Sequence, residues 1–178
     1  MIGKISRGGG FKGVLMYAAG ETAKDQHAIL LAQNLVDDPS TKNLAGAFTD
    51  HSTLGNTSKP VLHFSLAPTQ KDWQHFKNNP DKARAIIDEY MELMGFDSNH
   101  PRAAYQHNEK DGSGHFHIIT TNVLNDGKIW KSSNDYHRSK EACRTLETRY
   151  DLESVSSKPA QKRGASKNEV EKYNRIND

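Results

Sequence analysis

The chain has 178 residues, 34 % of them hydrophobic, and its 24 basic and 22 acidic side chains leave a net charge of +2. This length suffices for one domain with a core, and the low hydrophobic fraction predicts a solvated tail. No apolar stretch approaches the ~20 residues of a membrane span, the N-terminus has no apolar signal core, and the single Cys143 excludes an intrachain disulfide and a multi-cysteine zinc site. We therefore expect a cytoplasmic protein.

The N-terminal third is predicted to be helical and then irregular. Apolar residues at helical spacing predict a helix over Phe11–Ala19, directly after the glycine run Gly8–Gly10. The glycine run lacks the Gly-Lys-Ser/Thr ending of a phosphate-binding loop, and no strong strand precedes it. A second helix is predicted over Asp25–Val36, and the polar stretch Asp37–Lys59 is predicted to be mostly loop.

The middle of the chain combines a strand with a long helix. Val61–Ala67 alternates as a half-buried strand does, and Pro68 ends it. Thr69 has the character of a helix cap. We expect the helix that follows to break near Asn78–Pro80 and to resume as far as Met94.

The last predicted elements are a hairpin, a further turn and a helix. Ala103–His107 and His115–Leu124 are predicted strands around an Asp-Gly turn. A second turn at Asn125–Gly127 leads into Lys128–Lys131, and Tyr136–Tyr150 is predicted to be helical. Hairpin-connected strands with helices between them predict an α+β fold, a central antiparallel sheet with helices packed mainly on one face.

Basic residues gather in two stretches that contain no acidic side chain. These stretches could bind phosphates or be solvated segments. The stretches are Gly3–Lys12, with Lys4, Arg7 and Lys12, and Ser156–Lys167. Near the second stretch the composition turns polar. We therefore divide the chain into a domain of residues 1–152 and a tail of residues 153–178. The tail is expected to be a polar basic linker or a C-terminal helical extension. We expect it to lead into the remainder of a longer protein.

Three histidines around the Asp-Gly turn form the most informative motif. His115 and His117 are alternate residues of a predicted strand and therefore share a face of the sheet. Folding the hairpin lays His107 near them. Three neutral imidazoles on one sheet face suit a divalent metal and leave coordination positions open for a substrate. The histidines interpreted as ordinary surface or hydrogen-bonded residues are His27, His51, His75, His100 and His137.

The residues alone leave the attacking group open. Ser65 shares a strand face with His63, but no acid stands at a triad position. Glu109 and Asp111 sit beside the metal-binding histidines, and each is interpreted as a base, as a group that orients an imidazole, or as ordinary hairpin polarity. Tyrosine is a further possible nucleophile, and Tyr17 follows glycines and basic residues close to the N-terminus.

The order of these motifs resembles the relaxase and mobilisation nucleases of plasmids and integrative elements, in particular the MOBP-like branch of the HUH endonucleases. The resembling stretches are Met1–Tyr17, His63–Leu66, His107–His117 and Arg144–Leu152. They are similar, in this order, to the motif with the nucleophilic tyrosine, the motif whose serine contacts DNA, the metal-binding motif, and the helix end that follows it.

The resemblance implies an HUH relaxase-like fold and a metal-dependent enzyme that nicks and rejoins one DNA strand at an origin of transfer. It implies that His107, His115 and His117 hold a divalent ion, Mg²⁺ or Mn²⁺. It also implies that Tyr17 attacks the scissile phosphate to give a 5′-phosphotyrosine intermediate, with Glu109 as a second catalytic residue. The implied partners are single-stranded origin DNA, accessory relaxosome proteins and a coupling protein in the bacterial cytoplasm. The residues expected to contact DNA are Ser65, Lys4, Arg7 and Lys12.

Three alternatives stay open at this point. A rolling-circle replication initiator or single-strand transposase of the same superfamily would use a tyrosine after the histidine pair, such as Tyr136 or Tyr150. A non-catalytic metal-stabilised DNA-binding module would have a closed, four-coordinate site. A metal hydrolase acting through bound water would cleave DNA without forming a protein-linked product.

Overall fold

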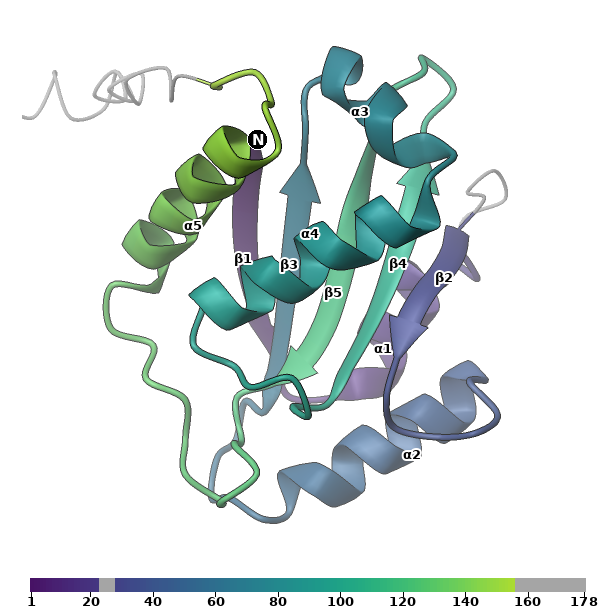
Figure 1. Cartoon of the computed structure of the whole chain (residues 1–178). Coiled ribbons are helices and arrows are strands. Elements are labelled where there is room, and N and C mark those ends of the chain that lie inside the picture. The colour runs from purple at the N-terminus through teal and green to yellow at the C-terminus, as the bar shows by residue number, and fades with distance from the viewer. Residues whose placement is uncertain (23–27, 156–178) are drawn as a thin grey trace, which may run out of the picture.

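The computed structural model describes residues 1–22 and 28–155. Its described part is built around a five-stranded antiparallel sheet in the order β1-β3-β5-β4-β2 (Figure 1). The strands are β1 (Ile2–Gly8), β2 (Ala28–Gln33), β3 (Val61–Ala67), β4 (Arg102–Asn108) and β5 (Gly114–Thr121). The helices are α1 (Phe11–Ala18), α2 (Thr41–Ser52), α3 (Gln70–Lys77), α4 (Pro80–Leu93) and α5 (Asp135–Arg149).

Helices cover the two faces of the sheet unequally. Helices α3, α4 and α5 lie on one side (Figure 1), over the larger core, to which Phe64 and Phe116 contribute from the sheet. Helices α1 and α2 cover one end of the opposite face, over a smaller core that includes Leu15, Phe48 and Ile119. The predicted α+β architecture, with an antiparallel sheet and helices mainly on one face, is therefore confirmed.

Strand β3 shows how alternation divides the two faces. Leu62, Phe64 and Leu66 are fully buried in the larger core. His63 and Ser65, between them, are only half-buried and point to the opposite face. Since successive side chains of a strand face opposite ways, the apolar residues that anchor the strand also present polar ones to the open side.

Two predicted elements of the N-terminal third were wrong. Ala28–Gln33 is strand β2, paired antiparallel with β4, where a helix was predicted; the first residues of that predicted helix lie outside the described ones. Pairing with a neighbouring strand outweighs the helical propensity of its two alanines and two leucines. Thr41–Ser52 is helix α2, where a loop was predicted. Its buried residues are Leu44 and Phe48, which lie four positions apart. Two apolar positions are too few to show a helical period in the sequence, so the helix was not recognised.

A third correction concerns the N-terminus. Ile2–Gly8 forms edge strand β1, paired with β3, although no strand was expected before the glycine run. The strand is hard to recognise because only Ile5 of its residues is buried, whereas Ile2, Lys4 and Ser6 are exposed on the open face.

The other predicted helices and strands are confirmed, most within one residue at each end, although β5 ends at Thr121, three residues before the predicted end of that strand. Thr69 caps α3, and Asn79 caps α4 after the predicted break. The hairpin of β4 and β5 and the helix α5 lie where expected. Beyond the second turn, the predicted Lys128–Lys131 element forms a single bridge, between Val123 and Ile129.

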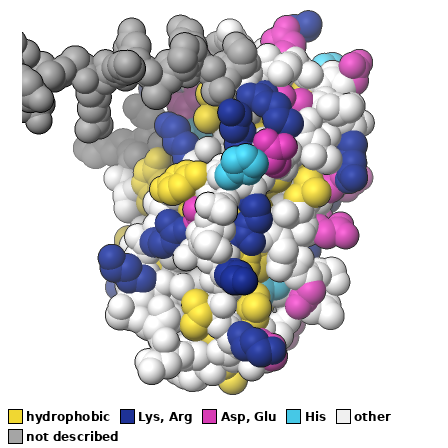
Figure 2. Space-filling model, turned by 90° about the vertical axis from the view of Figure 1, so that its left-hand side faces the viewer, with side chains coloured by type: hydrophobic (Ala, Val, Ile, Leu, Met, Phe, Trp, Pro, Cys, Tyr) yellow, Lys and Arg dark blue, Asp and Glu magenta, His cyan; other side chains and the backbone are white. Residues whose placement is uncertain are grey.

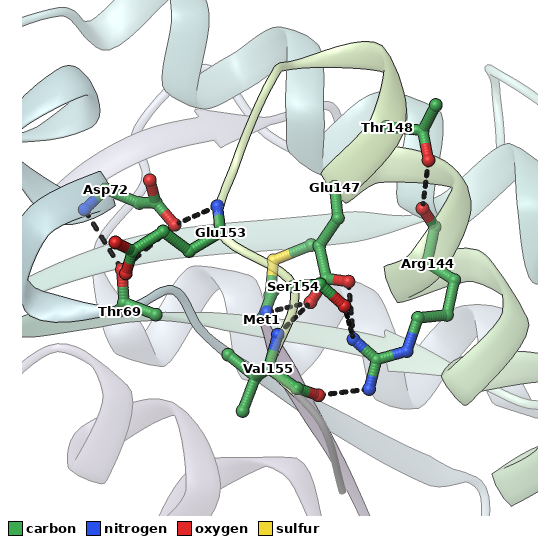
Figure 3. A network of polar contacts seen from close by, with 9 residues as sticks. All are labelled: Met1, Thr69, Asp72, Arg144, Glu147, Thr148, Glu153, Ser154 and Val155. Atoms are coloured by element: carbon green, nitrogen blue, oxygen red, sulfur yellow. Dashed lines mark hydrogen bonds and ion pairs between the residues drawn. The ribbon is translucent and has the colours of Figure 1, made fainter.

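Buried charges fix the start of β1 against the C-terminal part of α5 (Figure 3). The ammonium group of Met1 donates to Glu147, which also accepts hydrogen bonds from Arg144 and from the backbone of Val155. Burial by itself raises the pKa of Glu147, but the hydrogen bonds from Met1 and Arg144 outweigh it and lower the pKa below its usual value. This network holds β1 at the sheet edge and thereby places Lys4 and Ser6.

A last group of predictions concerns the C-terminal tail, of which the structure describes only residues 153–155. The basic stretch Ser156–Lys167 and the expected final helical piece from Ser166 lie outside the described residues, so the division at residue 152 stays a prediction. Within the described part of the chain, no helix is both long enough and apolar enough to cross a bilayer.

Candidate active site

Three imidazoles converge at one end of the hairpin formed by β4 and β5. His107 is paired directly with His115 in the register of the two strands, and His117 follows on the same face. One ring nitrogen from each histidine lies within 4.8 Å of those of the other two. The structure therefore gathers the predicted His107, His115 and His117 on one face of the sheet.

Two glycines allow the hairpin to bring these rings together. Gly112 has a φ of +82° in the turn, a conformation that other residues adopt only with strain. Gly114 opens β5 with no room for a side chain, because a Cβ atom would collide with the ring of Trp73 and the carbonyl of His107. Trp73 in turn donates from Nε1 to the Asn108 side chain at 3.2 Å, which ties α3 to the end of β4.

His107 offers an unpartnered nitrogen to the cluster. Its Nε2 lies 2.7 Å from the carbonyl oxygen of Ala18 and must donate, since a carbonyl only accepts. Its Nδ1 is buried and, within the described residues, has no hydrogen-bond partner. A buried acceptor nitrogen without a partner is costly unless something binds it. This nitrogen therefore fits a metal ligand.

His115 and His117 turn their Nε2 atoms toward each other, 2.9 Å apart. Two nitrogens that bind one ion at ~2.1 Å and at right angles are themselves ~3 Å apart. The opposite ring nitrogens have partners: Nδ1 of His115 is 3.5 Å from a Glu109 carboxylate oxygen, and Nδ1 of His117 is 2.7 Å from Nε2 of His63. Metal-bound histidines characteristically engage their second nitrogen in this way.

His63 is the residue of this cluster that the sequence analysis missed. It was noted for sharing a strand face with Ser65 and as the first residue of the stretch His63–Leu66, but not as a neighbour of the metal-binding histidines, because its approach to His117 depends on β3 lying beside β5. Burial, with a contribution from neighbouring imidazoles, lowers the pKa of His63 to about 4 and that of His117 to about 2. The same causes lower the pKa of His115. Neutral rings, the form in which histidine binds metals, are thus favoured at neutral pH.

Helix α1 carries Tyr17 to the edge of this cluster. Its ring centroid is 5.3 Å from that of His117, 6.3 Å from His63 and 6.4 Å from His107. Tyr17 is 42 % exposed, so a substrate can reach it. Since Ala18 is the next residue, the end of α1 both presents the phenol and orients His107.

Residues 17–152 match the family model of relaxases described as MobA/VirD2-like, nuclease domain. The chain belongs to the MobA/VirD2-like relaxase family. No curated protein matches the chain. Family membership makes the protein a relaxase nuclease, an enzyme that nicks DNA and binds single-stranded DNA. Relaxases of this family are metal-dependent. The cluster of His107, His115 and His117 could hold such an ion.

The other described tyrosines of this relaxase are less suited to the role, although Tyr105 is the register partner of His117. Tyr90 and Tyr105 are buried, which raises the pKa of both and that of Tyr105 to about 12. Tyr136 is exposed, with its hydroxyl 3.4 Å from the carbonyl of Ile5, and Tyr150 is partly buried beside the larger core. Among the described tyrosines, only Tyr17 has ring contacts with the site histidines.

A cavity of about 550 Å³ opens on the sheet face beside Tyr17 and the histidines. Two of the expected DNA contacts line it, Lys4 and Ser65, which are register partners on β1 and β3. The other two do not: Arg7 is ion-paired with Asp135, and Lys12 is exposed in the first turn of α1. The lining residues are Ile2, Lys4, Ile5, Ser6, Tyr17, His63, Ser65, Ala67, His115 and His117.

One side of the molecule is formed by α5 and the adjacent sheet edge. On this side the positive charges are scattered and form no single patch. Figure 2 shows Lys and Arg side chains scattered from the top to the bottom of this side, among apolar and uncharged surface. Charge density on this side therefore does not single out a DNA path, whereas the cavity beside Tyr17 offers one.

The two hairpin carboxylates have different surroundings. Asp111 accepts hydrogen bonds from the backbone and hydroxyl of Ser113 at 2.9 and 2.6 Å, which close the turn and lower the pKa of Asp111. Glu109, with a side chain 41 % exposed, faces Nδ1 of His115, the ring nitrogen opposite the cluster. Glu109 is thus placed to orient His115.

The histidines interpreted as ordinary residues have ordinary surroundings where the structure describes them. His51 and His100 each contact a backbone carbonyl, of Val123 and Thr121 respectively. His75 and His137 are exposed on helices, and His27 lies outside the described residues.

Proposed function

We propose that this relaxase nicks and rejoins one DNA strand at an origin of transfer, through a covalent link between Tyr17 and the DNA. The single observation that carries the proposal is the position of Tyr17, whose exposed ring lies 5.3 Å from that of His117 at the edge of the histidine cluster. A phenol in this position can reach a phosphate held by the same cluster.

In this proposal the three histidines hold a divalent ion, Mg²⁺ or Mn²⁺, through Nδ1 of His107 and Nε2 of His115 and His117. The ion supplies Lewis-acid polarisation of the scissile phosphate and offsets the charge that develops there. The orphaned Nδ1 of His107 and the 2.9 Å separation of the other two nitrogens support this ligand set.

The phenol oxygen of Tyr17 forms a new bond to phosphorus, and the bond from phosphorus to the 3′-oxygen breaks. The phenol proton leaves, the departing 3′-oxygen takes up a proton, and the DNA 5′-phosphate stays esterified to Tyr17. Because one phosphoester replaces another, the free 3′-hydroxyl can attack the phosphotyrosine and rejoin the strand. A tyrosine pKa near ~10 makes assistance from a nearby cation important.

The DNA lies single-stranded over the open sheet face in this proposal. Lys4 faces a phosphate from β1, and Ser65 lies beside it on β3. Ile2, 50 % exposed, offers an apolar surface to a base in the same cavity. Accessory relaxosome proteins and a coupling protein in the bacterial cytoplasm are the further partners that this role implies.

The proposal is tested with a library of random-sequence single-stranded DNA that carries a label at the 3′ end. Incubation with Mn²⁺ or Mg²⁺ should shift the label to the protein on a denaturing gel, because the 3′ fragment stays linked through its 5′-phosphate. Chelator should abolish the adduct. Sequencing of the covalently captured strands then identifies the preferred site.

The same assay separates the alternatives. A metal hydrolase would shorten the DNA without any labelled protein. A non-catalytic module would give neither product. Such a module would need a fourth protein ligand to close the metal site, and the next imidazole, that of His63, is directed at Nδ1 of His117 instead. An initiator-type enzyme would form its adduct through Tyr136 or Tyr150.

A further inference from the structure

Edge strand β1 and strand β3 place a pair of side chains behind one of the three clustered histidines. Nε2 of His63 lies 2.7 Å from Nδ1 of His117. Nδ1 of His63 lies 3.3 Å from the hydroxyl of Ser6. Ser6 and His63 are direct register partners, so the three side chains form a row across β1, β3 and β5.

We propose that His63, supported by Ser6, is a positioning residue that fixes the ring orientation and the tautomer of His117 for metal binding. This inference rests on the proposed function, in which His117 is a metal ligand. His63 itself touches neither the metal nor the DNA phosphate in this account.

The assignment follows from counting protons along the row. Nε2 of His117 faces Nε2 of His115 and is the nitrogen left for the ion. The proton of the neutral His117 ring must then sit on Nδ1, which donates to His63. Nε2 of His63 is therefore an acceptor, its proton sits on Nδ1, and the Ser6 hydroxyl accepts that proton's hydrogen bond.

The three clustered histidines differ in the partner of the ring nitrogen that points away from the proposed ion. His107 donates to a backbone carbonyl, and His115 faces a partly exposed carboxylate. His117 alone depends on a neutral side chain, His63, whose own orientation depends on Ser6 of an edge strand. Removing His63 should therefore free the His117 ring to turn and to exchange tautomers.

The first measurement is the affinity for Mn²⁺ alone, by calorimetry on the protein stripped of metal. Loss of a second partner of a metal-bound histidine typically weakens binding by ~10–100-fold, so His63→Leu should raise the Mn²⁺ Kd within that range. His63→Gln keeps an acceptor oxygen and should recover a large part of the affinity. His51→Leu, which removes a half-buried histidine away from the site, is the matched control and should leave the Kd unchanged.

The second measurement reads the tautomer directly, by long-range ¹H–¹⁵N correlation of the histidine rings with Zn²⁺ bound. The wild type should show the His117 proton on Nδ1, and His63→Leu should lose this single form. An unchanged tautomer together with an unchanged Mn²⁺ Kd in a folded His63→Leu variant overturns the proposal.

Two controls keep the outcome decisive. If His63→Leu does not fold, Ser6→Ala takes its place, and the proposal then requires a Kd raised by about twofold or more, as loss of one hydrogen bond predicts; no change would overturn it. Failure of the wild type to bind Mn²⁺ or to form the DNA adduct would instead reject the proposed function, which separates the two failures.

Discussion

The backbone carbonyl of Ala18 accepts a hydrogen bond from Nε2 of His107 at 2.7 Å, across 89 residues of sequence. This bond links the end of α1, where Tyr17 lies, to the histidine cluster on the β4–β5 hairpin. The position of the phenol and the free nitrogen of His107 are thus set by the same contact. The hydrogen bond thus joins two parts of the site that are remote in sequence.

This contact predicts that His107 contributes to stability as well as to metal binding. His107→Leu leaves the buried carbonyl of Ala18 without its donor, which should cost about 1–3 kcal/mol in the free energy of unfolding. His115→Leu, whose outer nitrogen faces the partly exposed Glu109, should cost less. Urea unfolding in the presence of chelator measures both, and equal costs would contradict the role given to Ala18. Both variants should lose Mn²⁺ binding.

Glu109 is predicted to act through His115 and not as the base for Tyr17. Glu109→Gln keeps a polar group beside the ring, so Mn²⁺ affinity should fall by no more than about tenfold. The single-turnover rate of adduct formation at saturating Mn²⁺ should stay within about threefold of wild type, whereas loss of a general base typically costs ~10²–10⁴-fold. A rate reduction of that size at saturating metal would make Glu109 a catalytic residue.

The stability of the metal-free protein should fall as the pH is lowered from neutrality. Burial and neighbouring imidazoles lower the pKa of His63 from 6.5 to about 4 in the folded state. Between these values the unfolded chain binds more protons than the folded one, so protonation favours unfolding. Urea midpoints in chelator should decrease from pH 7 to pH 4.5. His63→Leu should flatten this dependence, and an equally steep one would show that other groups cause it.

Lys4 is predicted to contribute more to DNA binding than the two other basic residues near the N-terminus. It lines the cavity, whereas Arg7 is ion-paired with Asp135 and Lys12 lies outside the cavity lining. Lys4→Gln should weaken single-stranded DNA binding and reduce the slope of log K against log salt by ~0.7, the value for one phosphate contact. Lys12→Gln is the control, and an equal slope change there would place the DNA elsewhere.

Local patterns were sufficient for the histidine hairpin but not for its neighbours. Alternation and the Asp-Gly turn placed His107, His115 and His117 together, because all three lie within one hairpin. The approach of His63 depends on β3 pairing with β5, a contact between distant segments. The position of Tyr17 followed from the family resemblance and not from its local sequence.

The errors in the fold have the same origin. The β2 segment has apolar residues that suit a helix or a strand, and its pairing with β4 decides for the strand. Strand β1 has a single buried residue, Ile5, so its alternation carries little signal. Helix α2 is recognisable mainly from its two anchors once the smaller core is known.

The most direct test of the central claim is to locate the DNA on the protein by mass spectrometry. The purified adduct is digested with nuclease and trypsin, and the peptides are sequenced by fragmentation. The account predicts a nucleotide mass on Tyr17, in the tryptic peptide of residues 13–24, and no adduct from Tyr17→Phe. A nucleotide on Tyr136 or Tyr150, or an undiminished adduct from Tyr17→Phe, would contradict it.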